Sequence, residues 1–219
     1  MKKIVSLILA CSLMCTSALA FDFEHLDKED TIAPEIIEKE TVSEWAKEEF
    51  DIANMLGLVP ALTDNPAFTG NITREQFAEL VVNMVEKVLG KEIAAAGSDT
   101  FTDTTNAAVL KACAAGIITG VGQGKFAPKT TTNREQIATM VYRAAQYIAQ
   151  QTGKDLTPKA GSVEAFADKA EISSWAVESV GKLAANDIMN GTSGTTASPK
   201  AACTVEQSIL LMYRVYQNV

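Results

Sequence analysis

The chain has 219 residues, of which 47% are hydrophobic and 6% aromatic, with 27 Asp and Glu against 19 Lys and Arg. The formal net charge of -8 argues against a nucleic-acid partner, because proteins that bind phosphate backbones need a positive surface. An anionic partner would have to be held by a few local cations against an unfavourable overall field. The positions of single Arg and Lys residues are therefore informative.

Residues 1–20 have the pattern of an export signal. Two lysines precede an apolar run over residues 4–13 that is too short to span a bilayer, and Ala18-Leu19-Ala20 is a small-x-small cleavage site. Cleavage there would remove both lysines and change the net charge from -8 to -10. A lipoprotein signal is the alternative, since Ile8-Leu9-Ala10-Cys11 resembles a lipobox. The signal predicts secretion to the cell surface, and we expect no transmembrane span in the mature chain.

Residues 21–41 form an acidic leader without a helical apolar stripe. The leader contains the only histidine, His25, and no second His or Cys lies beside it. Because no Ser-His-Asp set and no Cys/His cluster with metal spacing is possible, we expect no metal, no cofactor and no enzymatic activity. After cleavage Cys113 and Cys203 would remain. They could form a bridge, but we favour two unpaired buried thiols.

One short pattern occurs three times in the chain. Ile72-Thr73-Arg74-Glu75-Gln76 returns as Asn133-Arg134-Glu135-Gln136 and, altered, as Thr204-Val205-Glu206-Gln207. Each copy has the features of a helix start, with Thr or Asn as N-cap and Gln at N3, which together form a capping box. An amphipathic run follows each box, so we expect three capped helices that each bury one apolar face.

Helix stability does not explain the arginine of this pattern, since a cation at N1 faces the positive end of the helix dipole. The chain has only four arginines, and two of them, Arg74 and Arg134, occupy this place. Free amides beside the caps Thr73 and Asn133, together with a guanidinium, would form a site for a carboxylate or a phosphate. A surface arginine that happens to lie beside a cap is the alternative.

A first helix is predicted in each copy, with an anchor residue 28 or 29 residues before the cap. The anchors of this alignment are Trp45, Thr104 and Trp175. Each first helix runs into a turn where Gly or Asp suits a left-handed C-cap. These turn residues are Gly57, Gly116 and Asp187. The near-constant spacing indicates that each helix–loop–helix unit is a structural module.

The order of the motifs resembles the S-layer homology (SLH) domain. The resemblance is carried by Trp-Ala near a helix start, Gly-Ile-x-x-Gly, Phe-x-Pro and Thr-Arg-Glu, preceded by Phe101-Thr102-Asp103 and Phe166-Ala167-Asp168. It covers residues 42–219 as three copies. These span residues 42–90, 99–149 and 164–219. The resemblance implies an all-α fold in which three helix–loop–helix repeats form a pseudo-threefold spindle around a central three-helix bundle.

The resemblance also implies non-covalent anchoring to the wall of a bacterium. The implied partner is an anionic, pyruvylated secondary cell-wall polysaccharide that binds in grooves between repeats, with its carboxylate on Arg74 and Arg134. Because neither guanidinium is placed to stabilise its helix, removing both arginines should abolish wall binding and leave thermal stability nearly unchanged. In the third copy Val205 replaces the arginine, so Lys200 or Arg214 would have to substitute.

Four more residues are candidates for ligand binding, namely Lys129, Lys200, Trp45 and Trp175. The lysines recur at matching positions, although a lysine beside a turn is usually only solvated. The tryptophans could stack on a sugar face, but core packing is the commoner use of a Trp on a helix.

Two other functions remain open from the sequence. A helical-repeat adaptor for a surface protein partner would show an extended apolar or acidic concave face rather than recurring N-terminal arginines. A wall-active glycosidase would need two positioned carboxylates, and nothing in the sequence singles out such a pair. The sequence therefore favours a secreted wall-binding protein.

Overall fold

Three long helices begin at the three predicted capping boxes. They are α2 (Arg74–Leu89), α4 (Arg134–Thr152) and α6 (Val205–Gln217) in the computed structural model, which describes residues 41–219. At each start the N-cap side chain accepts a hydrogen bond from the N3 amide, and the N3 glutamine accepts one from the N-cap amide. The three capping boxes are therefore confirmed. The predicted signal and the acidic leader, including His25, lie outside the described residues apart from residue 41.

A shorter helix precedes each long one. These helices are α1 (Lys47–Met55), α3 (Ala107–Ala114) and α5 (Val177–Ala185), with a 3-10 turn, η1 (Lys169–Glu171), before α5. The predicted turn residues after them are left-handed, with φ of 69° at Gly57, 70° at Gly116 and 61° at Asp187. Residues 41–219 contain isolated bridges but no strand, so the predicted all-α class is confirmed.

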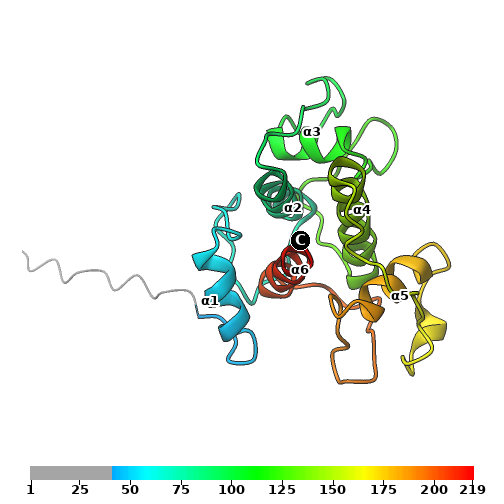
Figure 1. Ribbon diagram of the computed structural model, residues 1–219. Coiled ribbons are helices and arrows are strands. Elements are labelled where there is room, and N and C mark those ends of the chain that lie inside the picture. Colours follow the sequence, from blue (N-terminus) through cyan, green and yellow to red (C-terminus); the bar gives the residue numbers. More distant parts are fainter. Residues whose placement is uncertain (1–40) are drawn as a thin grey trace, which may run out of the picture. The chain divides into compact units, whose positions relative to one another are not determined.

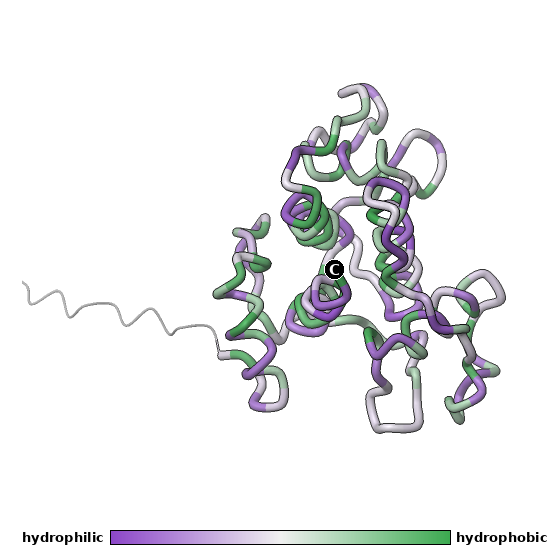
Figure 2. Tube along the Cα trace, in the orientation of Figure 1, coloured by the Kyte–Doolittle hydropathy of each residue, from purple (hydrophilic) through white to green (hydrophobic). Residues whose placement is uncertain are grey.

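The three long helices pack against one another at the centre of the described residues (Figure 1). Apolar residues of the three amphipathic runs face this core, and Phe77, Met84, Ile137 and Val141 are all 0% exposed. Hydrophobic and hydrophilic residues alternate along α2, α4 and α6 in Figure 2, as expected for helices that bury one face. Among the described helices, none combines the length and the apolar character needed to cross a bilayer.

We call each short helix and the long helix that follows it in the chain a helix pair. Each short helix packs against the long helix of another pair. Helix α3 contacts α2, α5 contacts α4, and α1 contacts α6 (Figure 1). Within residues 41–219, no short helix packs against the long helix that follows it in the chain. The helix–loop–helix unit recurs three times in the sequence, but its short helix is packed on the long helix of a neighbouring unit. Each long helix therefore packs against the next short helix in the chain, and the last long helix, α6, packs against the first short helix, α1.

A closed ring of backbone hydrogen bonds joins the residues that precede the three N-caps. The Ile72 amide donates to the Cys203 carbonyl (2.9 Å), the Cys203 amide to Thr132 (3.1 Å), and the Thr132 amide back to Ile72 (3.2 Å). All three residues are at most 2% exposed. Because each segment both donates and accepts, none can move without losing bonds to the other two.

The two cysteines of the described chain are unpaired, as favoured from the sequence. Cys203 is buried at the ring, and its thiol lies 3.5 Å from the Ser208 hydroxyl. Cys113 on α3 is only half-buried, so the expectation that both thiols are buried is wrong for this one.

The carboxylate of Glu206, in the first turn of α6, fixes the chain just before α1. It accepts hydrogen bonds from the Ser43 amide (2.9 Å) and the Ser43 hydroxyl (2.8 Å), and Glu206 is 3% exposed. Glu135 holds Ser173 before α5 in the same way, at 2.9 and 3.0 Å. The acidic residue of the repeated pattern thus ties each of these long helices to the next short helix.

Glu206→Ala should lower the free energy of unfolding by about 1–3 kcal/mol, because two donors at Ser43 lose a buried charged acceptor. Urea unfolding followed by circular dichroism measures this change. Glu48→Ala, at an exposed position in the first turn of α1, is the control and should change stability by less than about 0.5 kcal/mol. Equal effects of the two substitutions would contradict the role of Glu206.

Candidate ligand-binding grooves

Arg74 reaches from the N-terminus of α2 into the loop of the next helix pair. Its Nε donates to the Phe126 carbonyl (2.8 Å) and its Nη2 to the Thr119 carbonyl (2.7 Å). The guanidinium carbon lies 4.5 Å from the centre of the Phe126 ring, which is a cation–π contact. Arg74 is half-buried.

Arg134 repeats this arrangement at the N-terminus of α4. Its Nε donates to the Ala197 carbonyl (2.9 Å) and its Nη2 to the Asn190 carbonyl (3.1 Å). Arg134 is only 6% exposed, and burial lowers the pKa of its guanidinium. For both arginines, the structure gives Nη1 no hydrogen-bond partner among residues 41–219.

The amides at the helix N-termini are not free, contrary to the sequence-based expectation. The N1 and N2 amides of each long helix donate to carbonyls in the loop of the next helix pair at 2.8–3.1 Å. The acceptors are Thr130 and Pro128 for α2, Ala201 and Pro199 for α4, and Gly70 and Phe68 for α6. The N-cap side chain accepts a hydrogen bond from the N3 amide. An anion at these helix starts would therefore meet a guanidinium rather than backbone donors.

Two aspartates of the Phe-x-Asp motifs hold the loops that receive the arginines. Asp103 accepts the amides of Phe126 (2.8 Å) and Ala127 (2.9 Å), and the Phe126 bond is the main cause of the lowered pKa of its carboxyl. Asp168 accepts the amides of Ala197 (2.8 Å) and Ser198 (2.7 Å). Ala127 and Ser198 are both left-handed, so each carboxylate stabilises a turn that non-glycine residues rarely adopt.

Thr73 and Asn133 use their side-chain oxygens to cap their own helices. Lys129 pairs with Asp64 (2.6 Å) and Glu75 (3.4 Å). Each of these three side chains thus has a structural partner. None of them lies among the residues that line the two arginine grooves described below.

Lys200 also has structural partners and lies outside the two grooves. It contacts the Glu135 carboxylate (2.5 Å) and the Ser173 hydroxyl (2.6 Å). It therefore supports the junction between α4 and the residues before α5, and it does not replace the arginine that the third copy lacks.

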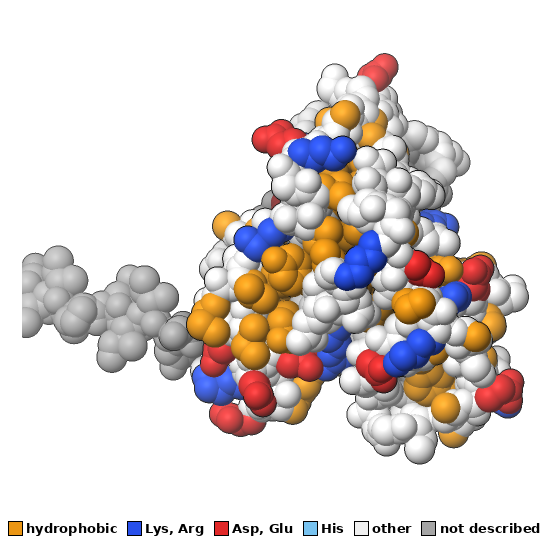
Figure 3. All heavy atoms as spheres, in the orientation of Figure 1, with side chains coloured by type: hydrophobic (Ala, Val, Ile, Leu, Met, Phe, Trp, Pro, Cys, Tyr) orange, Lys and Arg blue, Asp and Glu red, His pale blue; other side chains and the backbone are white. Residues whose placement is uncertain are grey.

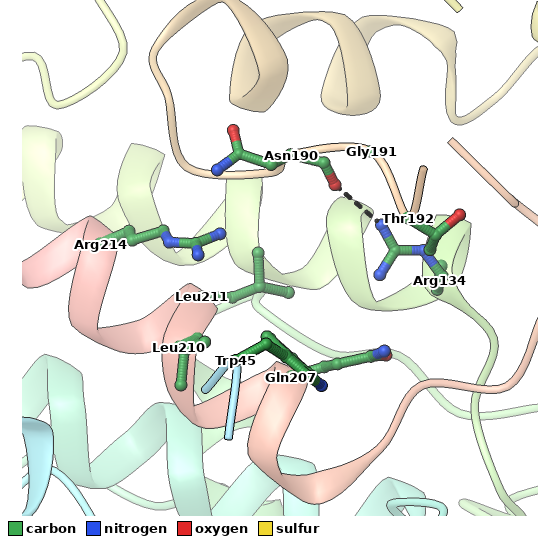
Figure 4. A pocket seen from close by; sticks show the side chains of 9 residues that line it. All are labelled: Trp45, Arg134, Asn190, Gly191, Thr192, Gln207, Leu210, Leu211 and Arg214. Atoms are coloured by element: carbon green, nitrogen blue, oxygen red, sulfur yellow. Dashed lines mark hydrogen bonds between the residues drawn. The ribbon is translucent and has the colours of Figure 1, made fainter. Parts of the chain in front are cut away.

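Arg134 lies in a groove of about 390 Å³ to which all three helix pairs contribute. The second pair supplies Arg134, the third supplies residues 190–192 together with Gln207 and Arg214 of α6, and the first supplies Trp45. Figure 4 shows that Arg134 and Arg214 lie on opposite sides of Leu211, beside the loop at residues 190–192.

Arg74 lies in a groove of about 280 Å³ whose lining residues correspond in position to those of the Arg134 groove. The first pair supplies Arg74, the second supplies residues 119–121 with Gln136 and Arg143 of α4, and the third supplies Trp175. Each lining residue has the same position in its repeat as the corresponding residue of the Arg134 groove. The chain therefore forms two equivalent grooves, each with two arginines, a glutamine and a tryptophan.

Both tryptophans are exposed at these grooves. Trp45 is 61% exposed and Trp175 is 54% exposed, whereas the next residue in each case, Ala46 or Ala176, is 0% exposed. The expectation of core packing is therefore wrong, because the small alanine takes the buried place and the indole stays at the surface.

The third equivalent position lacks this chemistry. Val205 and Asn83 stand at the positions that the two arginines have in the other grooves, and Thr104 stands at the position of the tryptophan. Val205 is 0% exposed, and the Asn83 amide group donates to the Gly57 carbonyl (3.0 Å). The structure thus offers two arginine grooves rather than three.

Sequence reasoning did not identify Arg143 and Arg214 as a pair of groove residues. Each follows the N1 position of its helix by nine residues, which a comparison of the three registers would have shown. On the face shown in Figure 3, Lys and Arg side chains lie apart from one another, and several of them lie beside Asp or Glu. The positive charge on this face therefore belongs to separate side chains and forms no continuous patch.

Comparison with known proteins identifies the repeats. Residues 99–138 and 165–204 match the model of the S-layer homology domain. The chain is also 32% identical over 143 residues to an endoglucanase of Bacillus sp. (strain KSM-635), an alignment that covers 64% of this chain and 14% of the endoglucanase. Residues 99–138 and 165–204 are therefore S-layer homology domains, a family whose members bind cell-wall polysaccharide.

Arg134→Met should lower the free energy of unfolding by about 1.5–3 kcal/mol, because a buried charged donor leaves two carbonyls of the next helix pair. This replaces the expectation that losing the arginines spares stability. Arg143→Met is the control, since the structure gives Arg143 no hydrogen bond within residues 41–219, and it should change stability by less than about 0.5 kcal/mol. Chemical denaturation would refute the assignment if the two variants behaved alike.

The folded state should lose stability in acid through Glu135. Burial alone would raise the pKa of its carboxyl, but bonds from Lys200 and Ser173 bring it below the ordinary 4.5. The unfolded chain then binds this proton at a higher pH than the folded chain does. The free energy of unfolding should therefore fall as the pH drops below 4.5 towards the folded-state pKa.

Glu135→Gln should flatten this pH dependence without abolishing it, since Asp103 and Asp168 also have lowered pKa values. Denaturant titrations at several pH values measure the slope. Glu171→Gln removes an exposed carboxylate and is the control. The assignment is wrong if both variants keep the slope of the unmodified protein.

Proposed function

We propose that this chain anchors non-covalently to a bacterial cell wall by binding an anionic secondary wall polysaccharide in its two arginine grooves. The acidic group is a carboxylate such as a pyruvate ketal. The recurrence of one groove at two junctions carries the proposal, because it places an arginine pair and an exposed tryptophan together twice.

The groove chemistry suits an acidic sugar. Arg74 and Arg134 keep a guanidinium nitrogen without a hydrogen-bond partner in the described chain, which suits planar recognition of a carboxylate. Trp45 and Trp175 supply a flat apolar face with a polar N–H, which suits stacking on a sugar ring.

We assign residues 42–90 as a third S-layer homology copy, beside 99–149 and 164–219. The support is structural, since α2 has the capping box and the neighbour contacts of α4 and α6. The three copies would then form the pseudo-threefold arrangement that the resemblance implies. Cleavage of the export signal would bring the protein to the cell surface.

A protein adaptor and a hydrolase fit the structure less well. An adaptor would be favoured by an extended apolar or acidic concave face, whereas the grooves carry paired arginines. The endoglucanase relative acts through a much longer chain, of which this one covers 14%. Its activity is therefore no guide to this chain. A surface protein partner would be an additional function.

Trp45→Ala and Trp175→Ala should each weaken binding to purified sacculi by about tenfold, because an exposed aromatic anchor is removed from the contact. Co-sedimentation with sacculi, before and after chemical removal of the non-peptidoglycan polymer, measures this. Met55→Ala is the control, since Met55 is 79% exposed on α1 and lies outside both grooves.

Binding that disappears with the polymer would support the proposal. Equal binding to stripped sacculi would instead identify peptidoglycan as the ligand. If neither preparation binds the folded protein, the adaptor function replaces the anchoring function.

A further inference from the structure

The two equivalent grooves differ in how their second arginine is engaged. In the Arg134 groove, Arg214 is paired with Glu49 of α1. Nε of Arg214 lies 2.9 Å and 3.3 Å from the two carboxylate oxygens, and Nη2 lies 2.8 Å from one of them. Nη1 lies 3.4 Å from the Ile188 carbonyl. All three nitrogens of this guanidinium thus have partners within the protein.

Arg143 occupies the same register in the Arg74 groove but is not paired. The structure gives it no hydrogen bond and no ion pair with any residue from 41 to 219, and its side chain is half-buried at the groove wall. The difference follows from one position in the short helices. Glu49 stands four residues after Trp45, whereas Ser179 stands four residues after Trp175 and is 5% exposed.

The ion pair of Arg214 with Glu49, which Arg143 lacks, changes how many unpaired guanidinium groups each groove presents to an anion. A carboxylate in the Arg74 groove meets two guanidinium groups, of which the second has no competing carboxylate. A carboxylate in the Arg134 groove meets one such group, because Glu49 already neutralises Arg214 and would repel a second anion brought close to it. The Glu49–Arg214 pair is partly shielded, with side-chain exposures of 36% and 18%, so solvent screens it less than a fully exposed pair.

We infer that the Arg74 groove is the stronger of two carboxylate sites, that Arg143 is its second ligand-binding cation, and that Glu49 weakens the Arg134 groove by occupying Arg214. This inference rests on the proposed function, and it identifies residues that make two corresponding sites unequal. Arg143 and Arg214 form a matched pair, so the same substitution tests both grooves.

Isothermal titration with the methyl glycoside of a hexosamine carrying a 4,6-pyruvate ketal tests the inference. The uncharged 4,6-isopropylidene analogue is the ligand control. The unmodified protein should show two sites whose Kd values differ by about tenfold. Arg143→Gln should weaken the tight site by about tenfold, whereas Arg214→Gln should change the weak site by less than about threefold.

Glu49→Gln provides the sharpest comparison. It should strengthen the weak site by about threefold to tenfold and bring the two sites together, because Arg214 becomes available to the ligand. Glu48→Gln removes the same charge from the neighbouring exposed position and should leave both sites unchanged. Thermal melts of every variant check that it remains folded.

The failures of the two proposals are distinguishable. If the glycoside binds but the sites are equal, or if Arg214→Gln costs as much as Arg143→Gln, the inference is wrong and the anchoring function stands. It is also wrong if Glu49→Gln and Glu48→Gln give the same result. If the folded, unmodified protein does not distinguish the pyruvylated glycoside from its uncharged analogue, carboxylate recognition fails and the inference fails with it.

Discussion

Each long helix gives its first two amides to carbonyls in the loop of the next helix pair, and this exchange determines the rest of the structure. The first amides of a helix have no partner within the helix, so burying them requires an external acceptor. Here the acceptor always belongs to a neighbour, in the cyclic order α2 to the second pair, α4 to the third, and α6 to the first. The ring through Ile72, Thr132 and Cys203 joins the same three segments with its donors running in the opposite order, and the packing of α1 on α6 completes the closure.

The grooves are a consequence of this exchange. Since a helix start and the neighbouring loop are held together by backbone bonds, the N1 side chain must point along that loop. Arg74 and Arg134 therefore both contact the loop carbonyls and line the groove beside them. The Trp-bearing segment arrives from the remaining pair, because each short helix packs on the long helix before it. A ligand in either groove would thus contact all three pairs, and its binding would depend on the integrity of the whole cyclic arrangement.

The local features of this fold were predictable from the sequence, whereas the partners were not. Capping boxes and left-handed turn residues depend on a few neighbouring residues, so Thr73 with Gln76, or Gly116 after α3, indicated their structures directly. The helix on which α1 packs depends on chain closure over more than a hundred residues, and the spacing of the motifs does not indicate that it is α6. The same limit explains the error about free amides, because their acceptors belong to distant loops. It also explains Trp45, whose exposure depends on Ala46 filling the buried place.

The third position separates the scaffold from the binding chemistry. Val205 cannot reach the first loop as an arginine would, yet its amide still donates to Gly70 and the Glu206 amide to Phe68. The backbone hydrogen bonds between the helix start and the neighbouring loop therefore form without a guanidinium. The arginine at N1, the arginine nine residues later and the tryptophan are all replaced at this junction, while the capping box remains. If the arginines were only structural, nothing would link their loss to the loss of an exposed tryptophan that contributes little to the core. Their joint absence is the pattern expected when three side chains serve one ligand.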